Sequence, residues 1–243
     1  MNSSAKERPF AELVLVHGAF HGPWCFDSVI PRFLERGVHA MALELPLETL
    51  EGDAATVRHV LDSLHRPAVV LGHSYGGAVI TWAGLHPAVS SLIYVAAVMP
   101  DAGEGIESGM SAEQIVPAPD LFESDPSGTL RINPTVAADI FYGDAEPARR
   151  REWAAKLRPG NVGFGEVVPH AAWRVKPSHY VVCLDDVLVP SQTQHWVAAR
   201  TNATVHELPG RHSPFLVRPD TFVELVGSIV DARSSRSIRS DGR

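Results

Sequence analysis

Short apolar runs alternate with longer segments of mixed polarity along most of the chain. The apolar runs predict six buried strands, at 12–18, 39–45, 68–74, 91–100, 179–186 and 203–210. The longer segments predict helices at 27–37, 52–64, 76–85, 191–200 and 220–232. Strands that alternate with helices are typical of a parallel sheet with helices on both faces. The pattern therefore predicts an α/β fold with a doubly wound, mostly parallel six-stranded sheet.

Acidic residues stand near the starts of two predicted helices. The helix at 52–64, whose apolar residues recur at i, i+3, i+4 and i+7, has Asp53 near its beginning. The closing helix begins close to Asp220. A carboxylate at this position accepts the backbone N–H groups that the first helical turn leaves unpaired. We therefore expect both residues to act as N-caps.

The alternation breaks between residues 101 and 177. This segment carries 8 of the 19 prolines, and only 136–157 has a clear helical pattern. We interpret it as an insertion that forms a lid on a core of residues 1–100 and 178–232. The polar, Ser- and Arg-rich tail at 233–243 is predicted to be disordered.

Composition narrows the classes of function. The chain has 243 residues, 45% of them hydrophobic, and a formal net charge of −7, which indicates one globular unit without a nucleic-acid-binding surface. Cys25 and Cys183 both lie in apolar contexts and are expected to be free, buried thiols. No long apolar segment or metal-binding spacing occurs. We expect a cytoplasmic, soluble protein with no membrane association, metal or cofactor.

The stretch GHSYGG, which begins at Gly72, carries the strongest chemical signal. It matches G-x-S-x-G and lies between a predicted strand and a predicted helix. In that context the turn is sharp, so Ser74 takes strained backbone angles and its hydroxyl stands clear of the sheet. Gly72 and Gly76 have no Cβ, which lets neighbouring backbone approach. The pattern predicts that Ser74 is a nucleophile.

A serine nucleophile needs a base, and His212 is the best placed of twelve histidines. It lies in a loop after the last predicted strand, at the same sheet edge as Ser74. His17, which precedes a glycine at a strand end, is expected to shape that turn, and His73, directly before the serine, is expected to pack sideways. His170 and His179 are weaker loop candidates.

The base needs a carboxylate that orients its ring. Asp186 ends the fifth predicted strand, and the chain order Ser74, Asp186, His212 is the order that this architecture uses. Asp185 is a close rival, because alternation along a strand turns only one of the pair toward the site. Asp101, after the fourth strand, is a third candidate.

Two backbone N–H groups are candidates for an oxyanion hole. Tyr75 follows the nucleophile directly, and its N–H points toward the same space. The second donor is expected from the loop after the first strand, at 17–24, where Gly18 lets the backbone turn in. The N–H of Ala19 is the donor that this geometry favours.

With these motifs the chain resembles the α/β-hydrolases, most of all the branch that holds small carboxylesterases, plant methyl-ester esterases and hydroxynitrile lyases. The matching pieces are LVLVHGAFHGPWCF (13–26), VVLGHSYGGAVI (69–80), IYVAAVMPD (93–101), YVVCLDDVLVP (180–190) and HSP (212–214). The resemblance implies Ser74 as nucleophile, Asp186 as acid and His212 as base, with oxyanion N–H groups from Ala19 and Tyr75. It also implies hydrolysis of a small-molecule carboxylic ester.

Some residues depart from this pattern. The loop after the second strand reads ELPLETLEGD (44–53) in place of the D-L-P-G-H-G of many hydrolases, so it shapes the site differently. Gly18 and Ser213 stand where hydroxynitrile lyases have a threonine and a lysine, which disfavours cyanide release. Two alternatives stay open: a biosynthetic tailoring enzyme for lactone hydrolysis, cyclisation or C–C cleavage, and a small-molecule receptor with little turnover.

Aromatic residues near the predicted site suggest a pocket for an apolar acyl or alcohol group. The candidates for substrate contact are Phe20, His21, Trp24, Phe141, Tyr142 and Trp153. They come from the loop after the first strand and from the insertion, where the aromatics could equally hold the insertion to the core. For the assembly we expect a monomer or a homodimer.

Overall fold

The computed structural model describes residues 11–108, 120–124, 126, 129–163 and 165–240, except for the side chains of 233–240. Small parts of the predicted core, insertion and tail therefore lie outside the described residues. Strand β1 (Ala11–Val16) follows the undescribed N-terminal residues directly.

The predicted six-stranded sheet is confirmed. Its strands are β1, β2 (Val38–Leu43), β3 (Ala68–His73), β4 (Val89–Val95), β7 (Ser178–Cys183) and β8 (Thr204–Leu208). They lie in the order β2-β1-β3-β4-β7-β8, and all five pairings are parallel. Because every strand runs the same way, the loops that follow the strands meet at one edge of the sheet.

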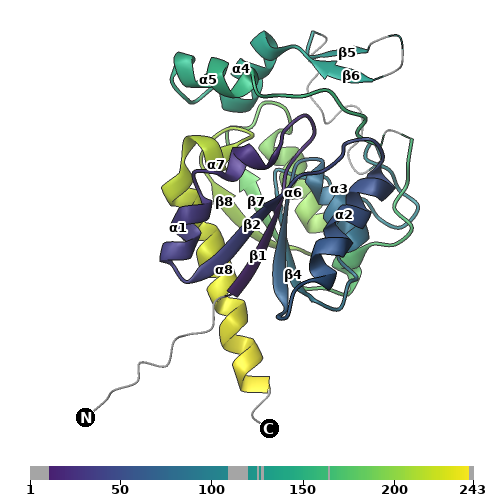
Figure 1. The fold of residues 1–243 in the computed structure, drawn as a ribbon, viewed down its shortest axis with the longest axis vertical. Coiled ribbons are helices and arrows are strands. Elements are labelled where there is room, and N and C mark those ends of the chain that lie inside the picture. The colour runs from purple at the N-terminus through teal and green to yellow at the C-terminus, as the bar shows by residue number, and fades with distance from the viewer. Residues whose placement is uncertain (1–10, 109–119, 125, 127–128, 164, 241–243) are drawn as a thin grey trace.

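Helices cover both faces of the sheet (Figure 1). One face packs against α2 (Leu50–Asp62), α3 (Gly76–Ala83) and α6 (Ser191–Arg200). The other packs against α1 (Ile30–Glu35), α7 (Pro214–Val217), α8 (Pro219–Ser240) and a short 3-10 helix, η1 (Pro23–Phe26). Alternate residues of each strand face opposite layers, so that Leu13 and Val14 of β1 belong to separate hydrophobic cores. This double burial explains why the strands are continuous apolar runs.

Residues 101–177 leave the sheet between β4 and β7. They contain β5 (Phe122–Ser124) paired antiparallel with β6 (Leu130–Ile132), then α4 (Pro134–Tyr142), α5 (Pro147–Ala154) and a short 3-10 helix, η2 (Ala172–Arg174). The sequence predicted a helical stretch at 136–157, whereas the structure forms two helices with a break between them. Figure 1 shows α4, α5, β5 and β6 beyond the carboxyl ends of the core strands.

Two predicted helix caps differ in the structure. Thr49, not Asp53, is the N-cap of α2, and its hydroxyl accepts the N–H of Gly52 at 3.0 Å. The helix therefore begins earlier than predicted, and Asp53 lies within it with its side chain buried. Asp220 follows the first residue of α8, and its carboxylate pairs with Arg32 at 2.6 Å.

Helix α8 also continues further than predicted. It runs to Ser240, into the segment 233–243 that the composition predicts to be disordered. No proline occurs between Asp220 and Ser240, so nothing in the backbone stops the helix from propagating beyond its packed part.

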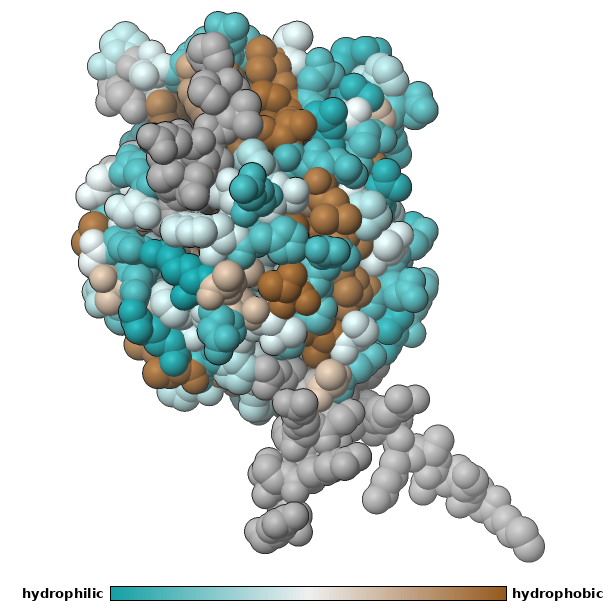
Figure 2. Space-filling view, turned by 180° about the vertical axis from the view of Figure 1, so that it is seen from behind, coloured by the Kyte–Doolittle hydropathy of each residue, from teal (hydrophilic) through white to brown (hydrophobic). Residues whose placement is uncertain are grey.

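On the face drawn in Figure 2, apolar side chains gather in several groups that polar residues separate. Cys25 and Cys183 are free and buried, as expected, and burial raises the pKa of both thiols well above its usual value. Within the described ranges, no helix combines the length and apolar character needed to cross a bilayer.

Candidate active site

The turn between β3 and α3 holds Ser74 in a strained conformation. Its φ of 53° lies in the left-handed region that a residue with a side chain rarely adopts. The Ser74 N–H donates to the Val95 carbonyl at 3.1 Å, and the Ser74 carbonyl accepts from Gly77 at 3.0 Å. The strand before the turn and the helix after it thus hold the serine from both sides. The predicted sharp turn is confirmed.

Three glycines make this turn compatible with close packing of the backbone. A Cβ on Gly72 would lie 2.5 Å from the Gly76 carbonyl oxygen, and one on Gly76 would lie 2.7 Å from that of Val16. A Cβ on Gly77 would lie 2.2 Å from the carbonyl oxygen of Val98. These separations are too short for any side chain, so the sequence requires glycine at all three positions.

His212 and Asp186 form a buried pair. The Nδ1 of His212 lies 2.7 Å from Oδ2 of Asp186, and both side chains are almost fully buried. The other carboxylate oxygen accepts the backbone N–H groups of Leu188 and Val189 at 2.9 and 3.1 Å. In this arrangement the Nδ1–H of His212 donates to the Asp186 carboxylate, which leaves Nε2 as the nitrogen with a basic lone pair.

The two rival carboxylates have other partners. Asp185 accepts the backbone N–H of Gly210 at 2.9 Å, so it braces the loop that carries His212. Asp101 pairs with Arg174, which lowers the pKa of the Asp101 carboxyl below its usual value. Asp186 is therefore the only one of the three candidates that contacts His212.

Gln194 of α6 is a buried partner of Asp186 that the sequence did not reveal. Its Nε2 donates to Oδ2 of Asp186 at 3.2 Å and to the Val189 carbonyl at 2.7 Å. Its Oε1 accepts the Cys183 N–H at 2.9 Å. A single glutamine in a helix of mixed polarity carries no motif, so only the packing of α6 against the end of β7 identifies it.

His73 connects the serine turn to the histidine loop. Its Nε2 donates to the His212 carbonyl at 2.8 Å, and the two rings lie 4.7 Å apart. Burial lowers the pKa of His73 well below its usual value, so the ring is neutral at pH 7. Because His73 precedes Ser74 directly, this bond brings the loop of His212 to the edge of the sheet where Ser74 lies.

The loop after β1 lies against the serine. A Cβ on Gly18 would lie 3.0 Å from Cβ of Ser74. Among the described residues, neither the Ala19 nor the Tyr75 N–H donates to a backbone carbonyl. Both donors are therefore available beside Ser74, as an oxyanion hole requires.

His17 orients one of these peptide groups. Its Nδ1 donates to the Gly18 carbonyl at 2.8 Å, and its Nε2 accepts the Leu45 N–H at 3.2 Å. Burial lowers the pKa of His17 to about 4, so the neutral tautomer with a proton on Nδ1 is the species at pH 7. The Gly18 carbonyl and the Ala19 N–H belong to one peptide plane, so this bond fixes the direction of the N–H.

The predicted pocket aromatics form a cluster around His21. Its Nδ1 donates to the Ala19 carbonyl at 2.9 Å, and its Nε2 accepts the Tyr142 hydroxyl at 2.9 Å. Burial lowers the pKa of His21 to about 3. The rings of Trp24 and Phe141 lie 5.7 and 5.4 Å from it, and Phe141 also stacks on His212 at 5.5 Å. The insertion is thus joined to the loop that carries Ala19.

The two remaining candidates lie at the margins of this cluster. Phe20 is buried, has a φ of 62° and faces Phe122 of β5 at 5.7 Å. Trp153 of α5 packs against Tyr142 at 5.4 Å. Trp153 thus contacts Tyr142, and Tyr142 in turn contacts His21.

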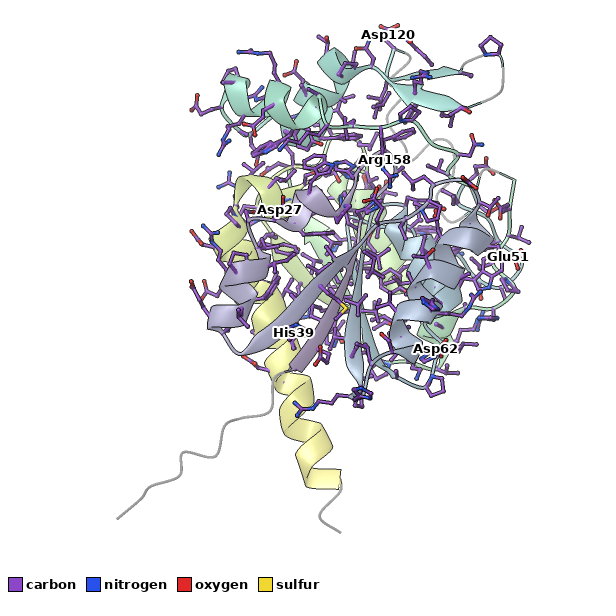
Figure 3. All side chains as sticks on the ribbon, viewed as in Figure 1. Asp27, His39, Glu51, Asp62, Asp120 and Arg158 are labelled. Carbon is purple, nitrogen blue, oxygen red and sulfur yellow. The ribbon has the colours of Figure 1, made fainter. Side chains whose placement is uncertain are left out.

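Arg158 ties the insertion to two loops of the core. Its Nε donates to the His21 carbonyl at 2.9 Å, a second guanidinium nitrogen donates to the Leu45 carbonyl, and a third lies 3.2 Å from Glu44. Figure 3 shows Arg158 between the insertion and the carboxyl end of the sheet. Among the described residues, no three His, Cys, Asp or Glu side chains are grouped as metal ligands.

Comparison with known proteins identifies the family to which this fold belongs. The profile of the Alpha/beta hydrolase family matches residues 13–225. A pyrethroid hydrolase from Sphingobium wenxiniae is 26% identical over 91% of this chain and 88% of its own length. Methylesterase 2 of Arabidopsis thaliana is 24% identical over 93% of this chain and 98% of its own length. The crystal structure of a pyrethroid hydrolase from Sphingobium faniae superposes with a TM-score of 0.77 at 25% identity, covering 92% of this chain and 98% of that one.

Proposed function

Because this chain belongs to the alpha/beta hydrolase family, we propose that it hydrolyses carboxylic esters with Ser74 as nucleophile, His212 as base and Asp186 as the residue that orients the base. The enzyme class, a carboxylic ester hydrolase, is that of its named relatives. The observation that carries the assignment of residues is the buried 2.7 Å contact between His212 and Asp186 beside the strained Ser74 turn.

The reaction proceeds in two acyl-transfer steps. In the first, Nε2 of His212 takes the Ser74 proton while Oγ bonds to the ester carbonyl carbon. The tetrahedral intermediate then collapses, the bond to the alcohol oxygen breaks, and His212 returns the proton to the leaving alcohol. In the second step a water attacks the acyl-enzyme and gives its proton to His212, which passes it to the departing Ser74. The products are one alcohol and one carboxylic acid.

The oxyanion of each intermediate binds to the N–H groups of Ala19 and Tyr75. Neither group has a backbone acceptor among the described residues, and both flank Ser74. Donors that are already oriented stabilise the developing charge without reorganisation, and loss of one such donor typically lowers kcat by about 10²- to 10³-fold.

The insertion acts as a lid in this proposal. The Phe141 ring stacks on His212, and Phe141 and Tyr142 both contact His21 next to the oxyanion loop. Apolar walls favour an ester whose acyl or alcohol group is itself apolar and of small to medium size.

The test is covalent labelling followed by hydrolysis. A fluorophosphonate should add once to the wild-type protein and not to Ser74→Ala or His212→Ala, as seen by intact mass. A panel of p-nitrophenyl esters of rising chain length then measures kcat and KM. Ser74→Ala should lower kcat by several decades and leave about 10³-fold acceleration over water. A folded wild-type protein that takes no label and turns over no ester would refute the proposal and favour a receptor.

A further inference from the structure

The loop after β2 is linked by hydrogen bonds to both candidate oxyanion donors, through a different side chain for each. On one side, the Leu45 N–H donates to His17, which orients the Gly18–Ala19 peptide. On the other side, the Leu47 N–H donates at 2.9 Å to Oδ1 of Asp53. This is the loop whose sequence departs from the D-L-P-G-H-G of many hydrolases, so its role has to come from its contacts in this chain.

Asp53 connects that loop to Tyr75. Its Oδ2 accepts the Tyr75 hydroxyl at 2.6 Å, and Asp53 itself has no exposed surface. Burial raises the pKa of the carboxyl, while burial and the neighbouring carboxylate raise that of the tyrosine, so the tyrosine remains the donor. Both oxygens of Asp53 thus hold N–H or O–H groups of other segments.

Burying the Asp53 carboxylate lowers the stability of the fold, and Asp53 does not offset this loss by stabilising helix α2. Thr49 already caps the helix, so capping does not require Asp53. Removing an acid from water is unfavourable unless hydrogen bonds compensate it. The partners that Asp53 receives are one loop N–H and the side chain of the residue that follows the nucleophile.

We propose that Asp53 and the Tyr75 hydroxyl are positioning groups that hold the Tyr75 N–H in the oxyanion geometry, an inference that rests on the proposed ester hydrolysis. Tyr75 is the residue before α3, and it is buried, with 4% of its surface exposed. The Tyr75 hydroxyl is held by Asp53 of α2. A rotation of the backbone between the strained Ser74 and Tyr75 would therefore break the 2.6 Å hydrogen bond between Tyr75 and Asp53. The pair therefore acts on the transition state rather than on the substrate pocket.

The experiment compares Tyr75→Phe, Asp53→Ala and Asp53→Asn with a matched control. The control is Tyr94→Phe, because the Tyr94 hydroxyl is also buried and lies 3.0 Å from the Thr81 hydroxyl of the same helix α3, yet makes no hydrogen bond to Ala19, Tyr75 or Asp53. For each folded variant, kcat and KM on one p-nitrophenyl ester, the rate of fluorophosphonate labelling and the melting temperature are measured.

We expect Tyr75→Phe and Asp53→Ala to lower kcat and the labelling rate about tenfold, with KM within about twofold, because a loosened donor costs less than a removed one. Asp53→Asn keeps an acceptor for the hydroxyl and should recover most of the loss. Tyr94→Phe should keep kcat and KM within about twofold of the wild-type values. Its melting temperature should fall about as much as that of Tyr75→Phe.

Two results would overturn the inference while leaving the proposed function intact: equal kcat in Tyr75→Phe and Tyr94→Phe, or a rise in KM that matches the fall in kcat. Should wild-type Ser74 take no label and hydrolyse no ester, the proposed function and this inference would both fall. If Asp53→Ala does not fold, the comparison of kcat between Tyr75→Phe and Tyr94→Phe still tests whether the Tyr75 hydroxyl positions the N–H.

Discussion

Replacing Gln194 by alanine tests how much the buried hydrogen bonds around Asp186 contribute to stability and turnover. The amide has no exposed surface. Its Oε1 accepts the Cys183 N–H at 2.9 Å, and its Nε2 lies 3.2, 2.7 and 3.3 Å from Asp186 Oδ2, the Val189 carbonyl and the Cys183 carbonyl. The substitution removes all four bonds and leaves their partners buried.

The expected size of the effect follows from these four bonds. Each buried hydrogen bond contributes about 1 kcal/mol net, and an orphaned partner costs about 1–3 kcal/mol. We therefore expect Gln194→Ala to lower the free energy of unfolding by about 2–4 kcal/mol. Because Asp186 loses one of the donors that set its orientation, the angle of the His212 ring loosens, and kcat should fall about tenfold.

The matched control is Gln192→Ala in the same helix. The Gln192 side chain is exposed, so its loss should change the free energy of unfolding by no more than about 0.5 kcal/mol. Urea unfolding gives the stabilities, and p-nitrophenyl ester turnover well below the melting temperature gives kcat and KM. The reasoning fails if folded Gln194→Ala turns over at the rate of Gln192→Ala.

Two further predictions concern the serine turn and the buried histidines. Gly77→Ala should lower the free energy of unfolding by about 3 kcal/mol or more, since its Cβ would meet the Val98 carbonyl oxygen at 2.2 Å; a melting temperature close to wild type would contradict this packing. His17, His21 and His73 are neutral when folded and have depressed pKa values, about 4 and about 3 for the first two. The unfolded chain binds these protons below about pH 6.5, so stability should fall by up to about 4 kcal/mol per pH unit between pH 6.5 and 4. Urea midpoints that stay constant from pH 7.5 to 5 would refute that assignment.

The order and type of the core elements could be predicted because they depend on local patterns. Strands buried on both faces are continuous apolar runs, and the sheet has the six strands that these runs indicated. The strained turn at Ser74 was predictable because its motif is contiguous in sequence, whereas the contacts that Gly76 and Gly77 relieve, with Val16 and Val98, come from other segments.

Residues whose roles depend on distant partners could not be assigned in this way. Asp53 has the local sequence of a helix cap, yet Thr49 occupies that position and Asp53 turns inward to Tyr75. Gln194 lies in an ordinary amphipathic segment, and only the approach of α6 to the end of β7 gives it partners.

The sequence by itself indicated the parallel sheet, the glycine turn that exposes Ser74 and the edge at which the candidate residues meet, because the hydrophobic period and the G-x-S-x-G motif are each contained in a few neighbouring residues. The sequence favoured Asp186 over Asp185 and Asp101, but only the tertiary structure showed its contact with His212 and the packing of His21 against Phe141. Those contacts join segments far apart in the chain, and a hydrogen bond forms only where packing brings a donor within about 3 Å of an acceptor.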